Sequence, residues 1–467
     1  MLTERLQHPL AAVAGAVLLT LPWLTVWLSG GPSAYGLSHV GTVGVSGLAV
    51  LGASFLLAWG AETAEKDVPR AFALAVLAVL AVAPEYAVDA LYAWNAGAGG
   101  ATSQACAALP PGFVEHVSQL PAAEINTARE ELARGCHAAN LAVANMTGAN
   151  RILIGLGWSG IALYSIYRIQ SEGDVAIVRE DGLLADRVRL DPSIATEIFF
   201  LFVATVFAFF VPVGGGIGIV DMVFLVGLYA SYIFLIVRGG VEEDEAHVGV
   251  PAYFQAFVRR HRVAVVLSLF AYSGLLIMTA VEPFAHGLEA VGIQMGIEPF
   301  LMIQWVAPLA SESPELIVVA YLVNKARTTA GFNALISSKL NQWTLLIGTL
   351  VVVYSISYGQ YGVLPFDEKQ AGEIWLTAAQ SLFALAILVN FTISAREALA
   401  LLALFLAQLH PAFHHYEALL GFSALYIVLA LALFARRSED LQRLVRMVSV
   451  HASGERLEES ERPHGGD

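Results

Sequence analysis

Two glutamates and two serines interrupt a long apolar stretch between Trp305 and Gly348, which otherwise predicts two membrane helices joined by a short basic turn. The polar run is Ser311, Glu312, Ser313, Pro314 and Glu315. Ionisable side chains at mid-membrane depth are costly and are usually kept for transport or proton relay. A proline also frees a backbone carbonyl one turn earlier, which suits a helix that lends oxygens to a cation. The run therefore predicts a cation site.

A structural alternative is a kinked helix whose carboxylates pair with Lys339. One such pair would need a single carboxylate, whereas the run offers two glutamates and two serine hydroxyls within five residues. We therefore favour the cation site.

A second copy of this pattern lies upstream. Pro84, Glu85 and Asp89 occupy an apolar helix, and the next long helix contains the polar, small-residue run from Ala144 to Asn150. The two halves of the chain thus share one order of features: Pro-Glu in one helix, then a polar patch in the following helix.

These residues resemble the cation/calcium exchanger superfamily, the sodium/calcium exchanger membrane region, in a divergent form of prokaryotic type. The family pattern is roughly T-S-x-P-E followed by G-N-x-x-G-S-N, present twice in inverted orientation. The resemblance covers about residues 39 to 410 in layout and is most specific at these motifs. It implies that Glu85 and Glu315 are paired central carboxylates, and that Asn145 and Asn150 match the two asparagines of the second motif.

Calcium and sodium are hard cations that take oxygen ligands from carboxylates, amides and hydroxyls. Glu85 and Asp89 are four residues apart and Glu312 and Glu315 are three apart, so each pair can share a helix face. Interhelical hydrogen bonding is the alternative role for the asparagines. The predicted cation-binding residues are Glu85, Asp89, Asn145, Asn150, Ser311, Glu312, Glu315, Ser338, Lys339, Asn341 and Gln342.

The departures from the family pattern concern ion choice and stoichiometry. Glu312 and Asp89 stand at family serine positions, and Ala81 and Val82 replace the first Thr-Ser. Lys339 stands where an asparagine is expected, and Gln342 replaces the later asparagine. We expect Lys339 to face the site. Arg151 follows Asn150 and points about 100° away around the helix, so we expect it to pair elsewhere or to line an aqueous vestibule.

Composition supports a polytopic membrane protein with an all-α fold. Of 467 residues, 57% are hydrophobic and 14% charged, which is far from the balance of a soluble enzyme. The net charge of −14 lies largely in loops and tail, so it gives no indication of nucleic-acid binding. The first apolar stretch has no small-residue cleavage site, so no cleaved signal peptide is expected.

About twelve apolar segments approach the length needed to cross a bilayer. They fall at roughly 10–28, 39–60, 71–95, 137–167, 193–212, 217–238, 263–286, 297–324, 331–357, 371–393, 395–410 and 414–435. The predicted architecture is two inverted repeats of about five helices with an extra helix at each end. The boundaries are 1–38 for the first extra helix, 39–238 for the first repeat, 239–262 for a solvated cytoplasmic linker, 263–410 for the second repeat, 411–438 for the last extra helix and 439–467 for a charged tail.

Basic residues are distributed unequally between the two sides of this topology. Of 25 lysines and arginines, only Arg129, Arg134 and Lys369 fall on the outer side, and Arg151 and Lys339 lie within helices. The rest fall on the side that holds both termini, which the positive-inside rule assigns to the cytoplasm. We expect an integral protein of the plasma (inner) membrane, with the lipid bilayer and small inorganic cations as its partners. Oligomeric state is left open.

The loops carry fewer signals. Cys106 and Cys136 share one polar loop and could form a disulfide if that loop faces an oxidising compartment. The tail after Leu441 is charged and is expected to be frayed or disordered. His410, His414 and His415 could bind a transition metal at the outer face, although an ordinary interfacial turn is the favoured interpretation.

These features predict a secondary cation antiporter, not an enzyme. It would export calcium in exchange for sodium or protons by alternating access, with these ions as cargo and no cofactor. A monovalent cation/proton exchanger is the alternative within transport. A distant alternative is an intramembrane hydrolase or metalloenzyme that uses the glutamate pairs as acid and base, but the sequence offers it no nucleophile, no mid-membrane histidine and no cofactor motif.

Overall fold

The computed structural model describes residues 8–67, 82–120, 125–168, 174–239, 249–410 and 415–453. These residues are mostly helical, which confirms the predicted all-α membrane class at that level. Eight of the described helices are long and apolar enough to cross a membrane, or nine if one bent pair counts as a span. The number of spans, about twelve in the sequence-based prediction, and the inverted repeats stay predictions.

The first part of the chain contains the helices that carry the upstream motifs. The elements are α2 (Pro9–Leu28), α3 (Pro32–Tyr35), α4 (His39–Ala64), η1 (Glu65–Asp67), α7 (Ala83–Ala98), α8 (Ser103–Ala107), α9 (Phe113–Ser118), α10 (Ala128–Ile152), η4 (Leu153–Trp158), α11 (Ser159–Tyr167), η5 (Pro192–Ile194), α12 (Ala195–Ala208), η6 (Val211–Gly214) and α13 (Ile219–Gly239). The predicted segment 71–95 begins among residues 68–81, which lie outside the described residues.

The second part contains the helices that carry the Ser-Glu-Ser-Pro-Glu run. The elements are α14 (Gly249–Gln255), α15 (Arg259–Met295), α16 (Pro299–Leu301), η7 (Met302–Val306), α17 (Ala307–Asn324), α18 (Thr328–Asn341), η8 (Gln342–Leu346), α19 (Ile347–Tyr358), α20 (Glu368–Leu388), α21 (Ala395–Gln408), α22 (Tyr416–Arg436) and α23 (Ser438–Ser453).

Local sequence explains where several helices begin. Thr127 caps α10 and forms a reciprocal capping box with Glu130, and Ser394 does the same for α21 with Glu397. Asp367 caps α20 by accepting from the Gln370 backbone N–H. These side chains satisfy backbone donors that a helix start leaves without a partner.

Short antiparallel strands tie the helix ends together. One sheet has the order β1 (Ile177–Val178), β2 (Arg187–Arg189), β5 (Thr392–Ser394), and the other pairs β3 (Gly216–Ile217) with β4 (Leu364–Pro365). In the first sheet Val188 lies opposite Ile393. The strands therefore join the connection before α12 to the connection before α21, across about 200 residues of sequence.

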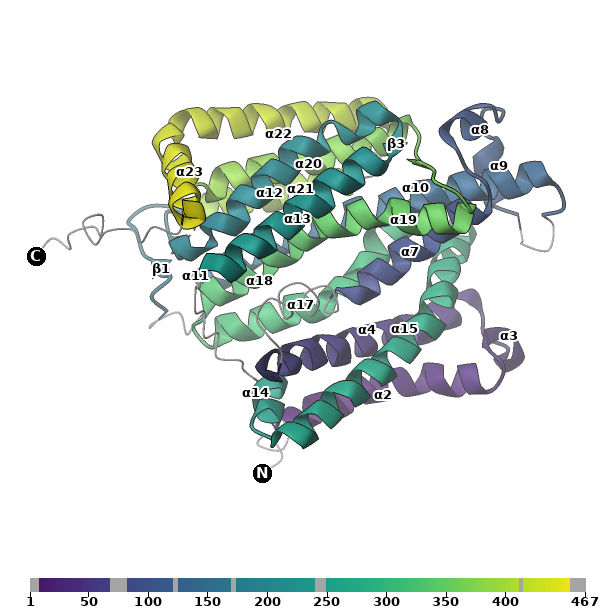
Figure 1. Cartoon of the computed structure of the whole chain (residues 1–467), viewed down its shortest axis with the longest axis horizontal. Coiled ribbons are helices and arrows are strands. Elements are labelled where there is room, and N and C mark those ends of the chain that lie inside the picture. Colours follow the sequence, from purple (N-terminus) through teal and green to yellow (C-terminus); the bar gives the residue numbers. More distant parts are fainter. Residues whose placement is uncertain are drawn as a thin grey trace, which may run out of the picture.

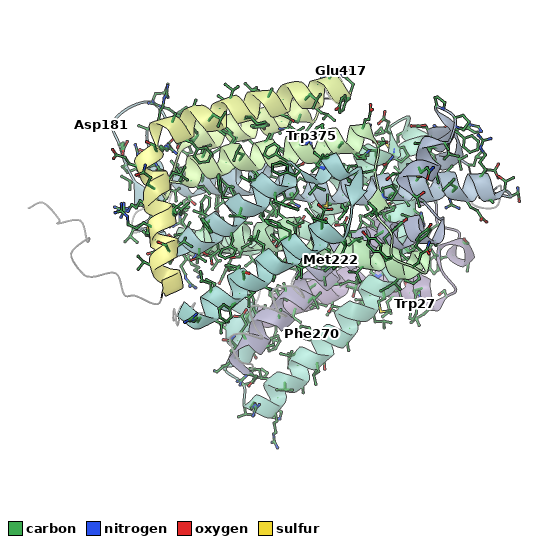
Figure 2. All side chains as sticks on the ribbon, turned by 45° about the horizontal axis from the view of Figure 1, so that its top comes forward. Trp27, Asp181, Met222, Phe270, Trp375 and Glu417 are labelled. Carbon is green, nitrogen blue, oxygen red and sulfur yellow. A yellow bond between two sulfur atoms is a disulfide. The ribbon has the colours of Figure 1, made fainter. Side chains whose placement is uncertain are left out.

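The long helices pack as two layers with α10 at the centre of the larger one (Figure 1). In the smaller layer α4 packs on both α2 and α15, and α14 closes its end. In the larger layer α10 contacts α7, α17, η7 and α20, while α22 packs on α20. Figure 2 shows carbon-rich side chains along the helices, including Trp27, which is 39% exposed. Apolar side chains on the outside of the bundle are suited to contact with lipid.

Three helical segments near the polar motifs are wound more loosely than an α-helix. Each of η4, η7 and η8 is a π-helical turn. The segment η4 begins two residues after Arg151, η7 lies directly before α17, and η8 begins at Gln342. Insertions of this kind occur frequently at functional sites. The axis also bends by 48° between Pro299–Ser313 and Glu315–Asn324, as expected around an internal proline.

Two expectations about the connections were wrong for the residues that the structure describes. The tail was expected to be frayed after Leu441, but α23 continues to Ser453 and buries Leu444 and Val448 against the bundle. The linker 239–262 was expected to be solvated, but α14 buries Val250 and Phe254 against α4. In both cases apolar residues spaced three or four apart supply a face that can pack. The acidic run at 242–245 lies outside the described residues.

The polar loop that holds both cysteines contains helices in the part that the structure describes. It contains α8 and α9, and a disulfide joins Cys106 to Cys136 at the start of α10, with a Cα–Cα distance of 5.9 Å. This bond holds the short helix α8 against the helix that carries Asn145.

Candidate functional site

The first half-site is formed by α7 and α10. The Asn145 side-chain amide nitrogen donates one hydrogen bond to Glu85 Oε1 at 2.6 Å and another to Asp89 Oδ1 at 3.0 Å. All three side chains are buried, at 1% exposure or less. The four-residue spacing on α7 thus places both carboxylates on the face that meets α10, as expected from helical geometry.

The second half-site is formed by α17 and the helix that follows it. Gln342 Nε2 donates to Glu312 Oε1 at 2.6 Å, and Ser338 Oγ donates to Glu315 Oε2 at 2.9 Å. Glu312 and Gln342 are buried. The arrangement repeats that of the first half-site, with carboxylates on one helix and amide or hydroxyl donors on the next.

Two contacts join the half-sites. Ser311 on α17 donates its hydroxyl to Glu85 on α7, and Tyr86 on α7 donates to Asn341 Oδ1 at 2.9 Å. Glu312 also lies within electrostatic reach of Glu85. The structure therefore brings the two Pro-Glu helices, which are more than 200 residues apart in sequence, to one place.

Lys339 does not pair with the carboxylates, which was the structural alternative for the polar run. Its ammonium donates to Asn150 Oδ1 at 2.9 Å and lies 3.4 Å from the Asn150 carbonyl oxygen. It also lies 4.8 Å from the centre of the Trp343 ring. Because Lys339 is fully buried, its charge is held by amide, carbonyl and aromatic groups that could otherwise face a cation.

Arg151 pairs away from the carboxylates, as its position one residue after Asn150 predicted. Its guanidinium forms a 2.5 Å ion pair with Glu373 on α20, contacts Gln408 Oε1 at 3.4 Å and stacks 4.7 Å from the Trp305 ring centre. Both side chains of the ion pair are at most 1% exposed. The pair is thus a buried tie between α10 and α20.

Sequence reasoning missed several polar residues around the site. Glu373 was not identified as the partner of Arg151, and Gln304 was not identified at all. Gln304 is fully buried, and among the described residues neither of its amide atoms has a hydrogen-bond partner. A buried glutamine in an apolar helix is a signal that could have drawn attention to it.

A glycine allows α10 and η7 to approach closely at this level. A Cβ atom on Gly148 would lie 1.8 Å from the Gln304 backbone oxygen. Any larger residue would therefore separate the two helices, which explains the glycine in the second motif of the first half.

Three oxygens in the site have no hydrogen-bond partner among the described residues. They are Asp89 Oδ2, Asn145 Oδ1 and Gln342 Oε1, and all three side chains are buried. Buried oxygens without donors are costly, and they are suitable ligands for a hard cation. Among the residues that the structure describes, however, no three Asp, Glu, His or Cys side chains converge on one point. A bound cation would therefore draw on the amide and hydroxyl oxygens as well as the carboxylates.

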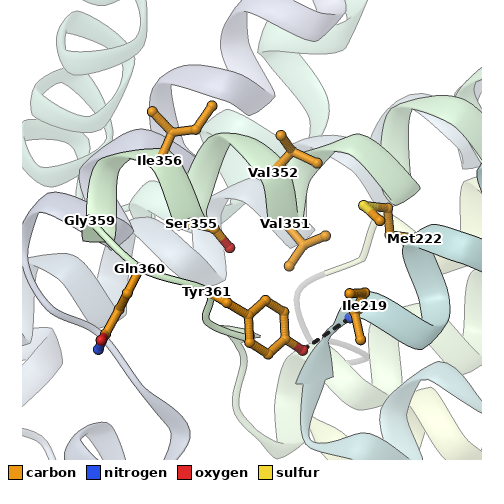
Figure 3. A pocket seen from close by; sticks show the side chains of 9 residues that line it. All are labelled: Ile219, Met222, Val351, Val352, Ser355, Ile356, Gly359, Gln360 and Tyr361. Carbon is orange, nitrogen blue, oxygen red and sulfur yellow. Dashed lines mark hydrogen bonds between the residues drawn. The ribbon is translucent and has the colours of Figure 1, made fainter.

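An apolar groove elsewhere on the surface has a different character. It lies between α13 and α19 and is lined by residues that include Ile219, Met222, Val351 and Ile356 (Figure 3). The backbone N–H of Ile219 donates a hydrogen bond to the Tyr361 hydroxyl at 3.2 Å. It contains none of the predicted cation-binding residues.

Comparison with known proteins gives one matching family. A family profile described as "Sodium/calcium exchanger protein" matches residues 122–238 and 265–413, more than half of the chain. This chain belongs to the sodium/calcium exchanger family. The resemblance drawn from the two Pro-Glu motifs is thereby confirmed.

Solved structures of other exchangers are similar to this family member. A crystal structure of the H+/Ca2+ exchanger CAX has 41% sequence identity and a TM-score of 0.78, covering 95% of this chain and 98% of that one. A structure of the sodium-calcium exchanger NCX_Mj, soaked with 2.5 mM Na+ and 0.1 mM Ca2+, has 15% identity and a TM-score of 0.43, covering 78% and 95%. No curated protein sequence matches the chain significantly.

Proposed function

We propose that this chain is a secondary active antiporter that exports calcium in exchange for protons or sodium by alternating access. The observation that carries the proposal is the junction of two carboxylate-bearing helices through Ser311 and Glu85. Two pairs of buried or half-buried carboxylates on adjoining helices carry a charge that requires compensation. A divalent cation compensates this charge in one step of the transport cycle, and protons or two monovalent cations compensate it in the return step.

The amides explain how the site could exchange one cargo for another. In the structure Asn145 and Gln342 turn their N–H groups towards Glu85 and Glu312. A half-turn of each amide would instead present the oxygen atoms that now lack a partner. The same side chains can thus stabilise carboxylates without a cation and coordinate calcium with one.

Proton coupling receives specific support from similarity. The H+/Ca2+ exchanger CAX is 41% identical over 95% of this chain, and at such identity the chemistry of the site is a reasonable basis for a proposal. Carboxylates are also the groups that can bind calcium and protons in turn. We therefore give calcium/proton exchange priority over calcium/sodium exchange.

A monovalent cation/proton exchanger remains the second candidate because of Lys339. Its ammonium already occupies the two Asn150 oxygens. A fixed positive charge at that position reduces the number of cations that the site can hold, which would favour a smaller cargo charge.

The proposed topology has both termini in the cytoplasm of a plasma-membrane protein. Residues 39–238 and 263–410 would form inverted repeats that face each other at the midplane. The end of the bundle that carries α8, α9 and the disulfide would then face outward, where an oxidising environment preserves such bonds.

Transport in proteoliposomes tests the proposal. The full chain is reconstituted with a calcium indicator inside, and calcium movement is driven by a pH gradient, by a sodium gradient or by neither. Calcium movement under the pH gradient, with reciprocal proton movement, supports calcium/proton exchange. Movement only under the sodium gradient assigns sodium as the counter-ion, and movement of monovalent cations without calcium assigns the second candidate. If neither calcium nor a monovalent cation moves in response to the pH gradient or the sodium gradient, the antiporter is rejected.

A further inference from the structure

A cluster of titratable side chains lies outside the cation site, where α7, α10 and α15 meet. Tyr92 on α7 donates its hydroxyl to Glu289 Oε1 on α15 at 2.9 Å. Two histidines flank the same carboxylate: His286 Nδ1 lies 3.4 Å from Oε1, and His137 Nε2 lies 3.8 Å from Oε2. His137 follows the disulfide-bonded Cys136. The cluster therefore belongs to the end of the bundle that carries the disulfide.

Exposure rises steadily across this cluster. Tyr92 is 1% exposed, the Glu289 and His137 side chains are 15% and 18% exposed, and the His286 side chain is 41% exposed. The four groups thus form a series that begins inside the bundle and ends at its surface.

The inner end of the series leads to the cation site. Asp89 and Tyr92 are three residues apart on α7, so they share one helix face. Asn145 contacts both Asp89 and Glu85. In addition, Asp89 Oδ2 is buried without a hydrogen-bond partner among the described residues. Polar groups therefore lie in order from His286 at the surface to Glu85 at the centre, and the step from Tyr92 to Asp89 is inferred from their spacing on α7.

The histidine contacts differ from those of a permanent ion pair. Both exceed the usual hydrogen-bond distance, and the His137 Nε2 atom is buried without a hydrogen-bond partner among the described residues. A neutral histidine does not form a salt bridge, whereas a protonated one beside a carboxylate does. The geometry suits a place where a proton arrives and leaves.

We propose that Glu289, together with Tyr92, His137 and His286, forms a proton relay between the disulfide-bearing face and the central carboxylates. The proposal rests on the proton-coupled form of the proposed function. Chains of carboxylates and histidines serve this purpose in membrane proteins, because a free proton does not cross hydrocarbon.

The proton transfers balance without any other reactant. A histidine N–H bond breaks as a Glu289 O–H bond forms, and the imidazole returns to its neutral state. Glu289 then gives a proton to the Tyr92 oxygen as the Tyr92 hydroxyl releases its own proton towards Asp89. Transport in the other direction reverses each transfer.

Other charges face this cluster and would influence its response to pH. They come from the elements packed around it, and they are Asp89 on α7, Glu115 on α9, Arg134 on α10, Glu282 on α15 and Asp367 before α20.

Side-specific flux measurements on the full chain test the relay. Proteoliposomes are sorted for one orientation by accessibility of the disulfide-bearing face, and calcium/proton exchange is recorded while pH is varied on that face alone. The variants are Glu289→Gln, Tyr92→Phe and the double variant His137→Gln/His286→Gln. The matched control is Glu298→Gln, an exposed acid near the same end that pairs with Lys369 at 2.8 Å.

The relay predicts that each variant loses the dependence of flux on pH at the disulfide-bearing face, while calcium binding measured at equilibrium stays at the wild-type level. Imidazole added on that face should restore flux in the double histidine variant, because a diffusible base can replace the missing side chains. Glu298→Gln should behave as the wild type.

Three results would overturn the relay. One is an unchanged pH profile in Glu289→Gln. Another is a loss of flux that imidazole does not restore and that leaves the pH profile intact, since this would indicate a structural role only. If the wild-type chain shows no calcium/proton exchange, the proposed coupling fails and the relay fails with it, so the two failures are distinguished by the wild-type measurement.

Discussion

Ser311 on α17 donates its hydroxyl to Glu85 on α7, across 226 residues of sequence. The contact joins a residue of the second Ser-Glu-Ser-Pro-Glu run to the glutamate of the first Pro-Glu pair. Each half of the chain holds its own carboxylates with its own amide or hydroxyl donors, and this bond crosses between the halves. Movement of one half relative to the other would therefore change the surroundings of Glu85 directly.

The first prediction concerns Glu85 and Glu315, the acidic residues at matching positions of the two halves. Glu85→Gln or Glu315→Gln should reduce coupled flux to the level of empty liposomes, because glutamine keeps the size of the side chain but removes a charged cation ligand. Protein yield and elution volume should stay normal. Glu298→Gln is the control, since exposed ion pairs contribute little to stability. Wild-type flux in either variant would exclude that residue from the site.

The second prediction concerns the ammonium of Lys339, which is bound to Asn150. Lys339→Asn should supply a neutral oxygen in place of a fixed cation, so the variant should bind an additional monovalent cation. We expect stronger sodium dependence and a changed charge movement per calcium ion, measured by flux at a set membrane potential. Lys369→Asn, at the partly exposed Glu298 contact, is the control. Unchanged ion dependence and charge movement would identify Lys339 as a structural partner.

The third prediction concerns the buried ion pair between Arg151 and Glu373. Arg151→Met or Glu373→Leu alone leaves one charge without a partner inside the bundle, which costs about 3–5 kcal/mol of unfolding free energy. The double variant Arg151→Met/Glu373→Leu should recover much of that loss. Thermal unfolding in detergent measures all three. If the loss of stability in the double variant equals the sum of the losses in the single variants, the pair contributes nothing beyond its separate side chains.

The fourth prediction concerns Cys106 and Cys136. A membrane-impermeant thiol reagent should label both residues from the outer side of cells only after reduction, because both sulfurs are in the disulfide. Cys106→Ser supplies the control, since it leaves one thiol free for labelling without reduction. Labelling of the unreduced wild type would show that the disulfide is absent. Labelling from the cytoplasmic side alone would show that the topology is the reverse of the proposed one.

Much of the candidate site could be predicted because its residues are conspicuous in their local setting. Glutamates and asparagines inside apolar helices have few explanations other than function, so Glu85, Asn145 and Glu312 were identified without knowledge of any contact. The sequence predicted that Lys339 faces the site, but it could not decide whether the partner of its ammonium is a carboxylate or Asn150. That choice depends on how α18 is rotated against α10.

Residues at the helix crossings were harder to predict. Glu373, Gln304 and Glu289 each lie in a separate helix without a companion motif, so nothing nearby in sequence indicates a partner. α23 was mistaken for a disordered tail because its composition is charged, although Leu444 and Val448 are spaced for one helix face.

The sequence by itself determined the membrane class and the family and indicated a candidate cation site, because hydropathy and ionisable groups within apolar segments are properties of local composition. The tertiary structure decided which groups meet: Ser311 with Glu85, Lys339 with Asn150, Arg151 with Glu373, and His137 and His286 with Glu289. Such pairings depend on the rotation and depth of each helix against its neighbours. Packing of the whole bundle sets those two quantities, since local sequence leaves them free.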